Sequence, residues 1–203
     1  MRAKCIAALL LGWAVAIPVA TGSAEASGPK GGRVQQAGIY SFTMKTIDGK
    51  DRPLSDYRGR ALLIVNTASK CGFTPQYQAM EALYQRYREQ GLEVLAFPAN
   101  NFMNQEPGTN QQIRDFCTTK YDVTFPLFAK ISVKGKDIHP LYAWLTRESG
   151  FPGDIKWNFN KFLVDPSGKV VARYDSGTDP LSPGLVRQLM AILPPEGEPD
   201  AKK

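Results

Sequence analysis

The sequence predicts an α/β domain with a central mixed β-sheet flanked by helices, and two observations lead to this class. An apolar run at 61–65 (ALLIV) is followed by a segment with helical spacing and then by a second apolar run at 92–98 (LEVLAFP). Strand, helix and strand in this order imply a right-handed parallel crossover. Later, WNFNKFLVD at 157–165 and KVVARY at 169–174 lie on either side of the turn sequence PSG, which predicts an antiparallel hairpin.

Cap and turn residues place the remaining elements. Thr74 is a good N-cap with Pro75 at the first helical position, and Gly91 fits a C-cap. Thr109 and Gln112 form a capping box for the next helix. We also expect a strand at 39–44, a short apolar segment at 123–131, and helices at 139–149 and 182–193. This order of elements fits a thioredoxin-like architecture best.

The chain begins with the three-part pattern of a secretory signal peptide: charged MRAK, an apolar stretch, and the small residues of TGSAEA. We expect residues 1–24 to be cleaved; an uncleaved anchor is the alternative, although the apolar run is shorter than a usual span. We expect residues 25–37 to be a flexible linker, 38–194 the folded domain and 195–203 a disordered tail. The protein is therefore expected to be periplasmic or secreted, without stable membrane insertion.

Charge and cysteine content narrow the function further. The formal net charge is +6, without a run of Lys and Arg dense enough for nucleic acid. Removing the leader leaves two cysteines, Cys71 and Cys117, which an oxidising compartment allows to pair. His139 is the single histidine, so we expect no metal centre, and no phosphate or dinucleotide fingerprint indicates a bound cofactor.

Cys71 is the first candidate for chemistry. It lies between a buried strand and a helix start, where free backbone N–H groups and the helix dipole favour an anion, and Lys70 adds a positive charge. The carboxyl ends of parallel strands are also where open α/β sheets place their sites. Position alone leaves two interpretations open, a reactive thiol and an inert buried thiol.

Three blocks of sequence carry a resemblance. NTASKCGFTPQY (66–77), FPANNFMNQEPGTN (97–110) and IKWNFNKFLVD (155–165) resemble, in this order, the motifs of the glutathione peroxidase family in its cysteine form. The similarity runs from about Ile39 to Leu193. It is specific, because three separate blocks occur in the right order.

The resemblance implies a role for each matching residue. Cys71 corresponds to the peroxidatic nucleophile, and Gln105, Trp157 and Asn158 to the hydrogen-bond donors around it. Cys117 matches the resolving cysteine of the thioredoxin-dependent branch. Cys117 shares an apolar helix face, so it is expected to start out buried and to need local unwinding to reach Cys71.

The implied activity is the reduction of hydrogen peroxide and of organic or lipid hydroperoxides, through a Cys71 sulfenic acid and a Cys71–Cys117 disulfide. A thioredoxin-like protein or a small thiol is the implied reductant. Only TRESGFPGDI separates HPLYAWL from KWNF, and this short connection resembles the monomeric type. Two alternatives stay open, a peroxide sensor that oxidises partner thiols and a non-enzymatic domain stapled by a Cys71–Cys117 disulfide.

The second block departs from the common family pattern. Ala99, Asn101 and Met103 stand where many relatives have Cys, Gln and Gly. The lost cysteine leaves Cys71 and Cys117 as the only pair in the mature chain. Methionine in place of glycine raises the question of the local backbone geometry, because glycine alone readily accepts a positive φ.

Overall fold

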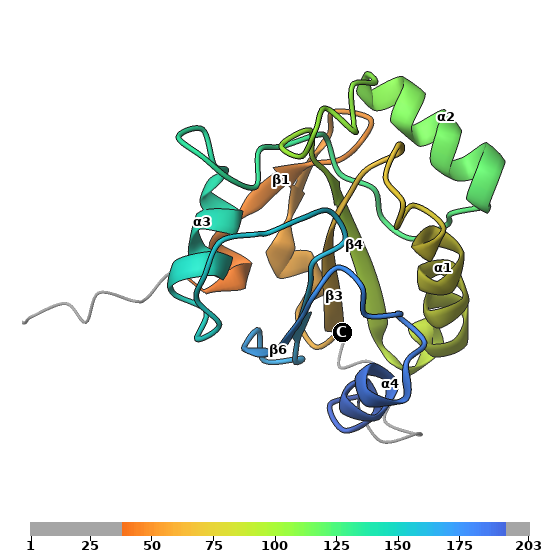
Figure 1. Ribbon diagram of the computed structural model, residues 1–203. Helices are drawn as coiled ribbons and strands as arrows, with labels where there is room; N and C mark the ends of the chain where they lie inside the picture. Colours follow the sequence, from red (N-terminus) through yellow and green to blue (C-terminus); the bar gives the residue numbers. More distant parts are fainter. Residues whose placement is uncertain (1–37, 194–203) are drawn as a thin grey trace, which may run out of the picture. The chain divides into compact units, whose positions relative to one another are not determined.

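The computed structural model describes residues 38–193 (Figure 1). The expected leader, linker and tail lie outside the described residues. Four strands form the main sheet in the order β4-β3-β5-β6. Their bounds are Ala61–Thr67 for β3, Leu92–Pro98 for β4, Lys161–Val164 for β5 and Val170–Tyr174 for β6. β3 pairs in parallel with β4 and antiparallel with β5, which pairs antiparallel with β6, so the predicted mixed sheet is confirmed.

Helices cover both faces of this sheet. The helices are α1 (Gln76–Tyr87), α2 (Asn110–Tyr121), α3 (Pro140–Arg147) and α4 (Pro183–Met190). Alternate residues of β3 point to opposite faces, as strand geometry requires. Leu63 and Val65 belong to one core cluster with residues of α1, α2 and α4, whereas Leu62 and Ile64 belong to a second with residues of α3. The sheet is thus the middle of three layers (Figure 1).

Smaller elements complete the domain. A hairpin of β1 (Thr43–Lys45) and β2 (Asp51–Pro53) lies apart from the main sheet, and three short 3₁₀ helices are η1 (Ile39–Ser41), η2 (Leu54–Tyr57) and η3 (Arg88–Gln90). The strand predicted at 39–44 is therefore wrong in its first half. The segment at 123–131 adds only two single bridges, Ala96 with Leu127 and Thr46 with Phe128.

Several predicted caps are confirmed. Thr109 and Gln112 form the capping box of α2, with both reciprocal bonds present. Gly91 has φ +99° and ends the turn that follows α1, so it is a left-handed C-cap. Thr74 is not an N-cap: α1 begins at Gln76, and the hydroxyl of Thr74 bonds elsewhere.

Candidate active site

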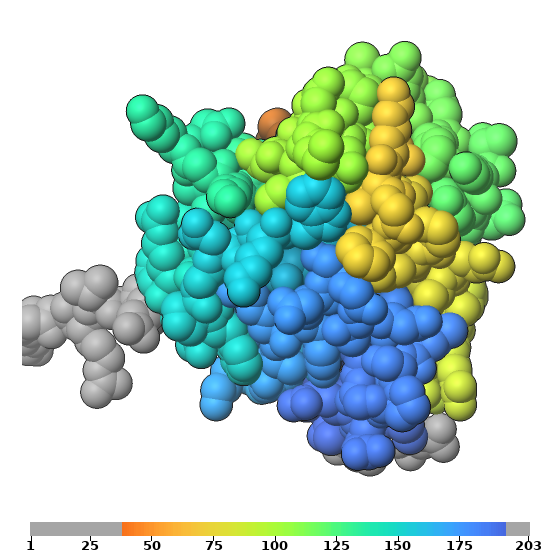
Figure 2. Space-filling model, in the orientation of Figure 1, coloured from red at the N-terminus to blue at the C-terminus, as the bar shows by residue number. Residues whose placement is uncertain are grey.

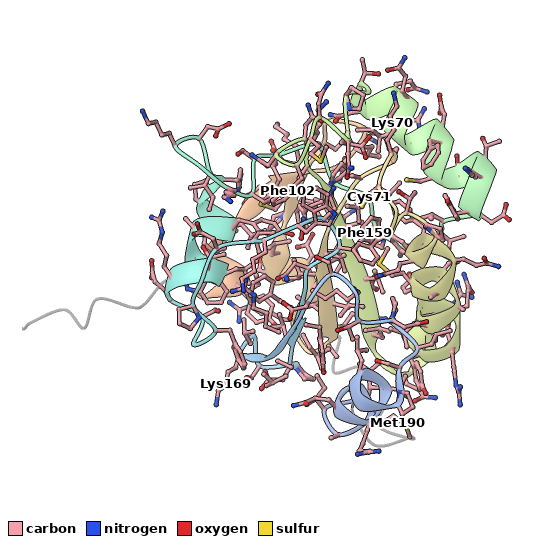
Figure 3. All side chains as sticks on the ribbon, viewed as in Figure 1. Lys70, Cys71, Phe102, Phe159, Lys169 and Met190 are labelled. Atoms are coloured by element: carbon pink, nitrogen blue, oxygen red, sulfur yellow. The ribbon has the colours of Figure 1, made fainter. Side chains whose placement is uncertain are left out.

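Cys71 lies just beyond the carboxyl end of β3, in the loop that leads into α1 (Figure 3). Cys71 is 8% exposed. In the parallel pair, the last residue of β4, Pro98, lies beside the last residue of β3, Thr67. The loops after both strands therefore emerge at the same edge of the sheet. This is the edge at which α/β sheets hold their sites.

Thr74 shapes the Cys71 loop. The Cys71 N–H donates to Thr74 Oγ1 at 2.9 Å, and the Thr74 hydroxyl donates to the Ala68 carbonyl at 2.9 Å. The Thr74 N–H returns to the Cys71 carbonyl at 3.0 Å. One donor reaches the sulfur itself, since the Phe73 N–H lies 3.4 Å from Cys71 Sγ. A backbone N–H aimed at sulfur stabilises negative charge there.

Gln105 ends a tight turn in the loop after β4. Its N–H donates to the Phe102 carbonyl at 3.1 Å, and the two residues between them, Met103 and Asn104, have φ +49° and +53°. Positive φ at both central positions defines a type I′ turn. The Lys70 N–H donates to the Gln105 carbonyl at 3.0 Å, which ties this turn to the residue before Cys71.

Trp157 and Asn158 lie in a loop before β5, and Asn66 at the end of β3 holds that loop. Asn66 Nδ2 donates to the Trp157 carbonyl at 3.1 Å, and Asn66 Oδ1 accepts the Asn160 N–H at 3.1 Å. The Phe159 N–H donates to the Asn66 carbonyl at 2.6 Å. The predicted strand at 157–165 is therefore wrong in its first half, because this loop bonds to Asn66 and turns through Phe159 at φ +63°.

Asn158 joins two of these loops directly. Its Nδ2 donates to Gln105 Oε1 at 2.8 Å, while the Trp157 ring packs on Phe102 with 5.5 Å between ring centres. Asn158 is fully buried, and its Oδ1 has no hydrogen-bond partner in the structure. A buried acceptor without a partner is costly, and a ligand O–H that reached it would remove that cost.

The predicted site residues Gln105, Trp157 and Asn158 are thus brought together at the edge where Cys71 lies. The segments around residues 70–75 (yellow), 100–108 (green) and 155–160 (light blue) meet on one face in Figure 2. In this arrangement Cys71 can act as a nucleophile, and the Gln105 amide and the Trp157 indole can donate to a developing oxyanion. Such a set can displace an oxygen leaving group.

Comparison with known proteins decides the family. A sequence profile described as glutathione peroxidase matches residues 39–146. The chain belongs to the glutathione peroxidase family. It is 52% identical over 145 residues to the glutathione peroxidase homolog BsaA of Bacillus subtilis, covering 70% of this chain and 91% of that protein. It is 53% identical over 150 residues to the hydroperoxy fatty acid reductase gpx1 of Synechocystis, covering 70% and 89%. The chain is therefore a peroxidase of this family.

Solved structures agree with the fold. The crystal structure of T. cruzi GPX1 matches with a TM-score of 0.59 and 37% identity, over 77% of this chain and 96% of that one. A thiol:disulfide interchange protein of the thioredoxin family from Chlorobium tepidum matches with a TM-score of 0.59 at 15% identity, over 78% and 97%. The second likeness shows the thioredoxin-like fold alone.

Cys117 of this peroxidase is fully buried in α2, as expected from its helix face. Burial raises the pKa of its thiol to about 11, and the nearby Tyr77 hydroxyl offsets part of this effect. Cys71 and Cys117 are both free thiols. Both belong to the core cluster on the α1 and α2 face.

Glu106, next to Gln105, is a buried carboxylate that the sequence did not single out. It is 1% exposed, and its Oε2 accepts the Ser69 hydroxyl at 3.0 Å. Its N–H donates to Asn100 Oδ1 at 2.8 Å, and its carbonyl accepts Lys130 Nζ at 3.0 Å. Desolvation raises the pKa of Glu106, against the opposing effect of the Ser69 hydrogen bonds. Glu106 thus fixes the loop that carries Gln105 against the residues before Cys71.

Lys161 is a second buried charge, three positions after the site residue Asn158. It is the first residue of β5, is fully buried, and donates from Nζ to the Phe159 carbonyl at 2.8 Å. Burial lowers the pKa of its amino group to about 8. This bond supports Phe159 in its left-handed conformation, immediately after Asn158.

Sequence reasoning missed Asn66, Glu106 and Lys161. Asn66 could have been found, since it is a polar residue directly after the apolar run ALLIV. Glu106 and Lys161 carried no such signal, because charged residues are ordinarily at the surface. Within residues 38–193, no helix is long and apolar enough to cross a membrane, and no three His, Cys, Asp or Glu side chains could together hold a metal ion.

Proposed function

We propose that this peroxidase uses Cys71 as its nucleophile. The Cys71 thiolate attacks the terminal oxygen of a hydroperoxide, so that an S–O bond forms as the O–O bond breaks. Sulfur is oxidised by two electrons to a sulfenic acid, and the electron pair of the broken bond leaves with an alkoxide. The alkoxide takes up the proton that the thiol lost and departs as an alcohol, or as water when the substrate is hydrogen peroxide.

The surrounding groups have separate tasks in this step. The Phe73 N–H, at 3.4 Å from Sγ, stabilises the thiolate. Gln105 accepts from Asn158 through Oε1, which leaves its amide N–H groups to donate to the peroxide. The unpartnered Asn158 Oδ1 accepts the hydroperoxide O–H, and the Trp157 indole N–H stabilises the leaving oxygen. The hydrogen bond between the side chains of Asn158 and Gln105 is the observation that carries this proposal.

A resolving step follows. The Cys117 thiol attacks the sulfenic sulfur, forms a disulfide with Cys71 and releases water. The Cys117 carbonyl accepts the N–H groups of Asp122 and Val123, which end α2, so this last turn has to open before the sulfur atoms meet. A thioredoxin-like protein or a small thiol then supplies two electrons and two protons to restore both thiols.

Two further features of the proposal concern substrate and location. The similarity to a protein named hydroperoxy fatty acid reductase supports organic and lipid hydroperoxides as substrates besides hydrogen peroxide. The signal-peptide pattern supports export to the periplasm or the medium, with the peroxidase acting there as a monomer. Mass measurement of the N-terminus of the protein made in a secreting host tests the cleavage of residues 1–24, and an intact segment refutes it.

Stopped-flow oxidation with hydrogen peroxide tests the chemistry. Cys71→Ser is expected to abolish rapid oxidation, because serine has no comparable nucleophile. Cys117→Ser is expected to consume one equivalent of peroxide and then stop at the sulfenic acid, which a dimedone adduct on Cys71 detects by mass. Equal oxidation rates in the wild type and Cys71→Ser refute the assignment.

The same system separates the alternatives. Continuous peroxide consumption with a thioredoxin system supports turnover, whereas oxidation of partner thiols alone supports a sensor. A structural staple is expected to have a reduction potential below about −300 mV, and a catalytic disulfide a higher one.

A further inference from the structure

Exposed apolar side chains gather near the proposed site. Within residues 38–193, four large apolar side chains are exposed, and two of them lie two positions from a site residue. Phe73 follows Cys71 and is 36% exposed; Met103 precedes Gln105 and is 80% exposed. The other two, Leu181 and Met190, lie near or in α4. An apolar side chain that water surrounds gains free energy when an apolar partner covers it.

Met103 also has an unfavourable backbone. Its φ of +49° lies in the left-handed region, which costs free energy for any residue with a Cβ atom. The turn around it is fixed from both sides, because Gln105 bonds back to the Phe102 carbonyl and the Phe102 ring packs on Trp157. A strained and exposed methionine in a fixed turn has no packing role in the fold, so its side chain is available to a ligand.

The geometry points to one occupant: we propose that Met103 contacts the apolar chain of a long-chain acyl hydroperoxide whose –OOH group lies at Cys71. This inference rests on the proposed peroxidase function and names the substrate feature that the site selects. Figure 2 shows the green segment that carries the Met103 turn beside the yellow segment that carries Cys71 and Phe73. Substrate atoms that extend from Cys71 across this junction therefore pass the two segments that carry the exposed Phe73 and Met103.

The side chain is suited to this contact. Methionine is unbranched and polarisable, so it adapts to flexible alkyl chains. Hydrogen peroxide has no apolar part and gains nothing from Met103. The residue therefore determines specificity, since it touches the chain of the substrate and none of the reacting atoms.

The test compares substrates within one protein sample. The second-order rate constant for oxidation of Cys71 is measured with linoleic acid hydroperoxide, with phosphatidylcholine hydroperoxide in detergent micelles and with hydrogen peroxide. The ratio of each acyl hydroperoxide to hydrogen peroxide is the readout. For Met103→Gln, which keeps the length but is polar, we expect this ratio to fall by about fivefold. Met103→Leu restores the apolar surface and is expected to keep at least half of the wild-type ratio.

A matched control uses the other exposed methionine. Met190, in α4, is 59% exposed, and Met190→Gln is expected to leave both rates unchanged. A fall with either acyl hydroperoxide supports the inference, and the arm that falls shows whether a free fatty acid or a phospholipid is the source. Unchanged ratios in Met103→Gln, or an equal fall in Met103→Leu, overturn it. A wild type that reacts with none of the three peroxides refutes the proposed function instead.

Met103→Gly separates a loss of substrate contact from a loss of stability. Glycine accepts φ +49° without strain, so this variant is expected to melt at a higher temperature than the wild type while its substrate ratio falls as in Met103→Gln. A stabilised variant with an undiminished ratio overturns the inference.

Discussion

The side-chain amide of Asn158 donates to Gln105 Oε1 at 2.8 Å, across 53 positions of the chain. This bond fixes the orientation of both amides, because Gln105 then presents its N–H groups and Asn158 presents Oδ1 as a buried acceptor. The loop after β4 and the loop before β5 are thereby joined into one surface. We therefore expect Gln105 and Asn158 to act as a single unit in the reaction.

Removal of either amide tests this unit. Gln105→Ala and Asn158→Ala are each expected to slow peroxide oxidation of Cys71 by about 100-fold. The first change removes a donor to the developing oxyanion, and the second removes the buried acceptor together with the bond that orients Gln105. The double variant is expected to lose much less than the product of the two effects, since each single change already disables its partner. Stopped-flow rates give the comparison. Gln111→Ala is the control, because Gln111 is exposed on α2 and bonds only Asp115 among the described contacts. Effects that multiply fully would contradict the coupling.

Short-range sequence patterns correctly predicted β3, β4 and the start of α2. The apolar runs at 61–65 and 92–98 became β3 and β4 because a strand buried on both faces needs continuous apolar residues. The capping box of Thr109 and Gln112 was readable because both partners lie within one turn of helix. The family resemblance supplied the site residues, which the spacing of the residues could not.

Long-range bonds account for what the sequence did not predict. The alternation WNFNKF favours a strand, yet Asn66, 91 positions from Trp157, holds the first half as a loop. A threonine before Pro75 suits an N-cap equally well whether its hydroxyl bonds forward to the helix or back to Ala68, as Thr74 does. The buried charges of Glu106 and Lys161 depend on partners in distant segments or on backbone geometry, which no local pattern encodes.

Cys117 is expected to resist alkylation in the reduced protein. Its pKa of about 11 leaves about one thiolate in ten thousand at pH 7, and its side chain is fully buried. Brief iodoacetamide treatment at pH 7, read by peptide mass, should therefore label Cys71 and leave Cys117 free. Labelling in urea should reach both residues, and Cys117→Ser should give one adduct in either condition. Rapid native labelling of Cys117 would show that α2 opens without any oxidation of Cys71.

His139 is expected to make the fold sensitive to mild acid. Its Nδ1 accepts the Leu141 N–H at 3.2 Å and caps α3, a role that only the neutral ring can perform. Burial lowers the pKa of His139 below its usual 6.5, so the unfolded chain binds the proton more tightly. Stability from this residue is therefore present above about pH 6.5 and is lost as pH falls through the lower folded value.

Thermal melts at pH 7.5 and pH 5.5 measure the effect of His139. His139→Asn keeps a capping acceptor without a titrating ring, so the drop in melting temperature between the two pH values should be smaller than in the wild type. His139→Ala should cost about 1 kcal/mol at pH 7.5 through the lost cap. The comparison between proteins cancels the opposing contribution of Glu106, whose raised pKa favours the folded state as pH falls. Equal drops in the wild type and His139→Asn would refute the assignment.

Lys161 is expected to lower the stability of the fold at pH 7 while it holds the turn after Asn158. Its pKa falls from 10.5 to about 8 on burial, so between these values the unfolded chain binds more protons than the folded one. The contribution of Lys161 to stability is present in full above pH 10.5 and is lost as pH falls through 8, which amounts to up to roughly 3 kcal/mol. Lys161→Met removes the cost of burying the amino group, so the unfolding free energy of this variant at pH 7 should equal or exceed that of the wild type.

The same substitution should harm the reaction, because the Phe159 carbonyl loses its donor and the left-handed turn after Asn158 is no longer held. We expect oxidation of Cys71 in Lys161→Met to slow by about tenfold, an effect of about 1.4 kcal/mol on the barrier. Urea unfolding from pH 7 to 10.5 and stopped-flow rates at pH 7 measure the two effects. The exposed Lys169→Met is the matched control and should change neither. A destabilised Lys161→Met with an unchanged rate would instead make Lys161 a purely structural residue.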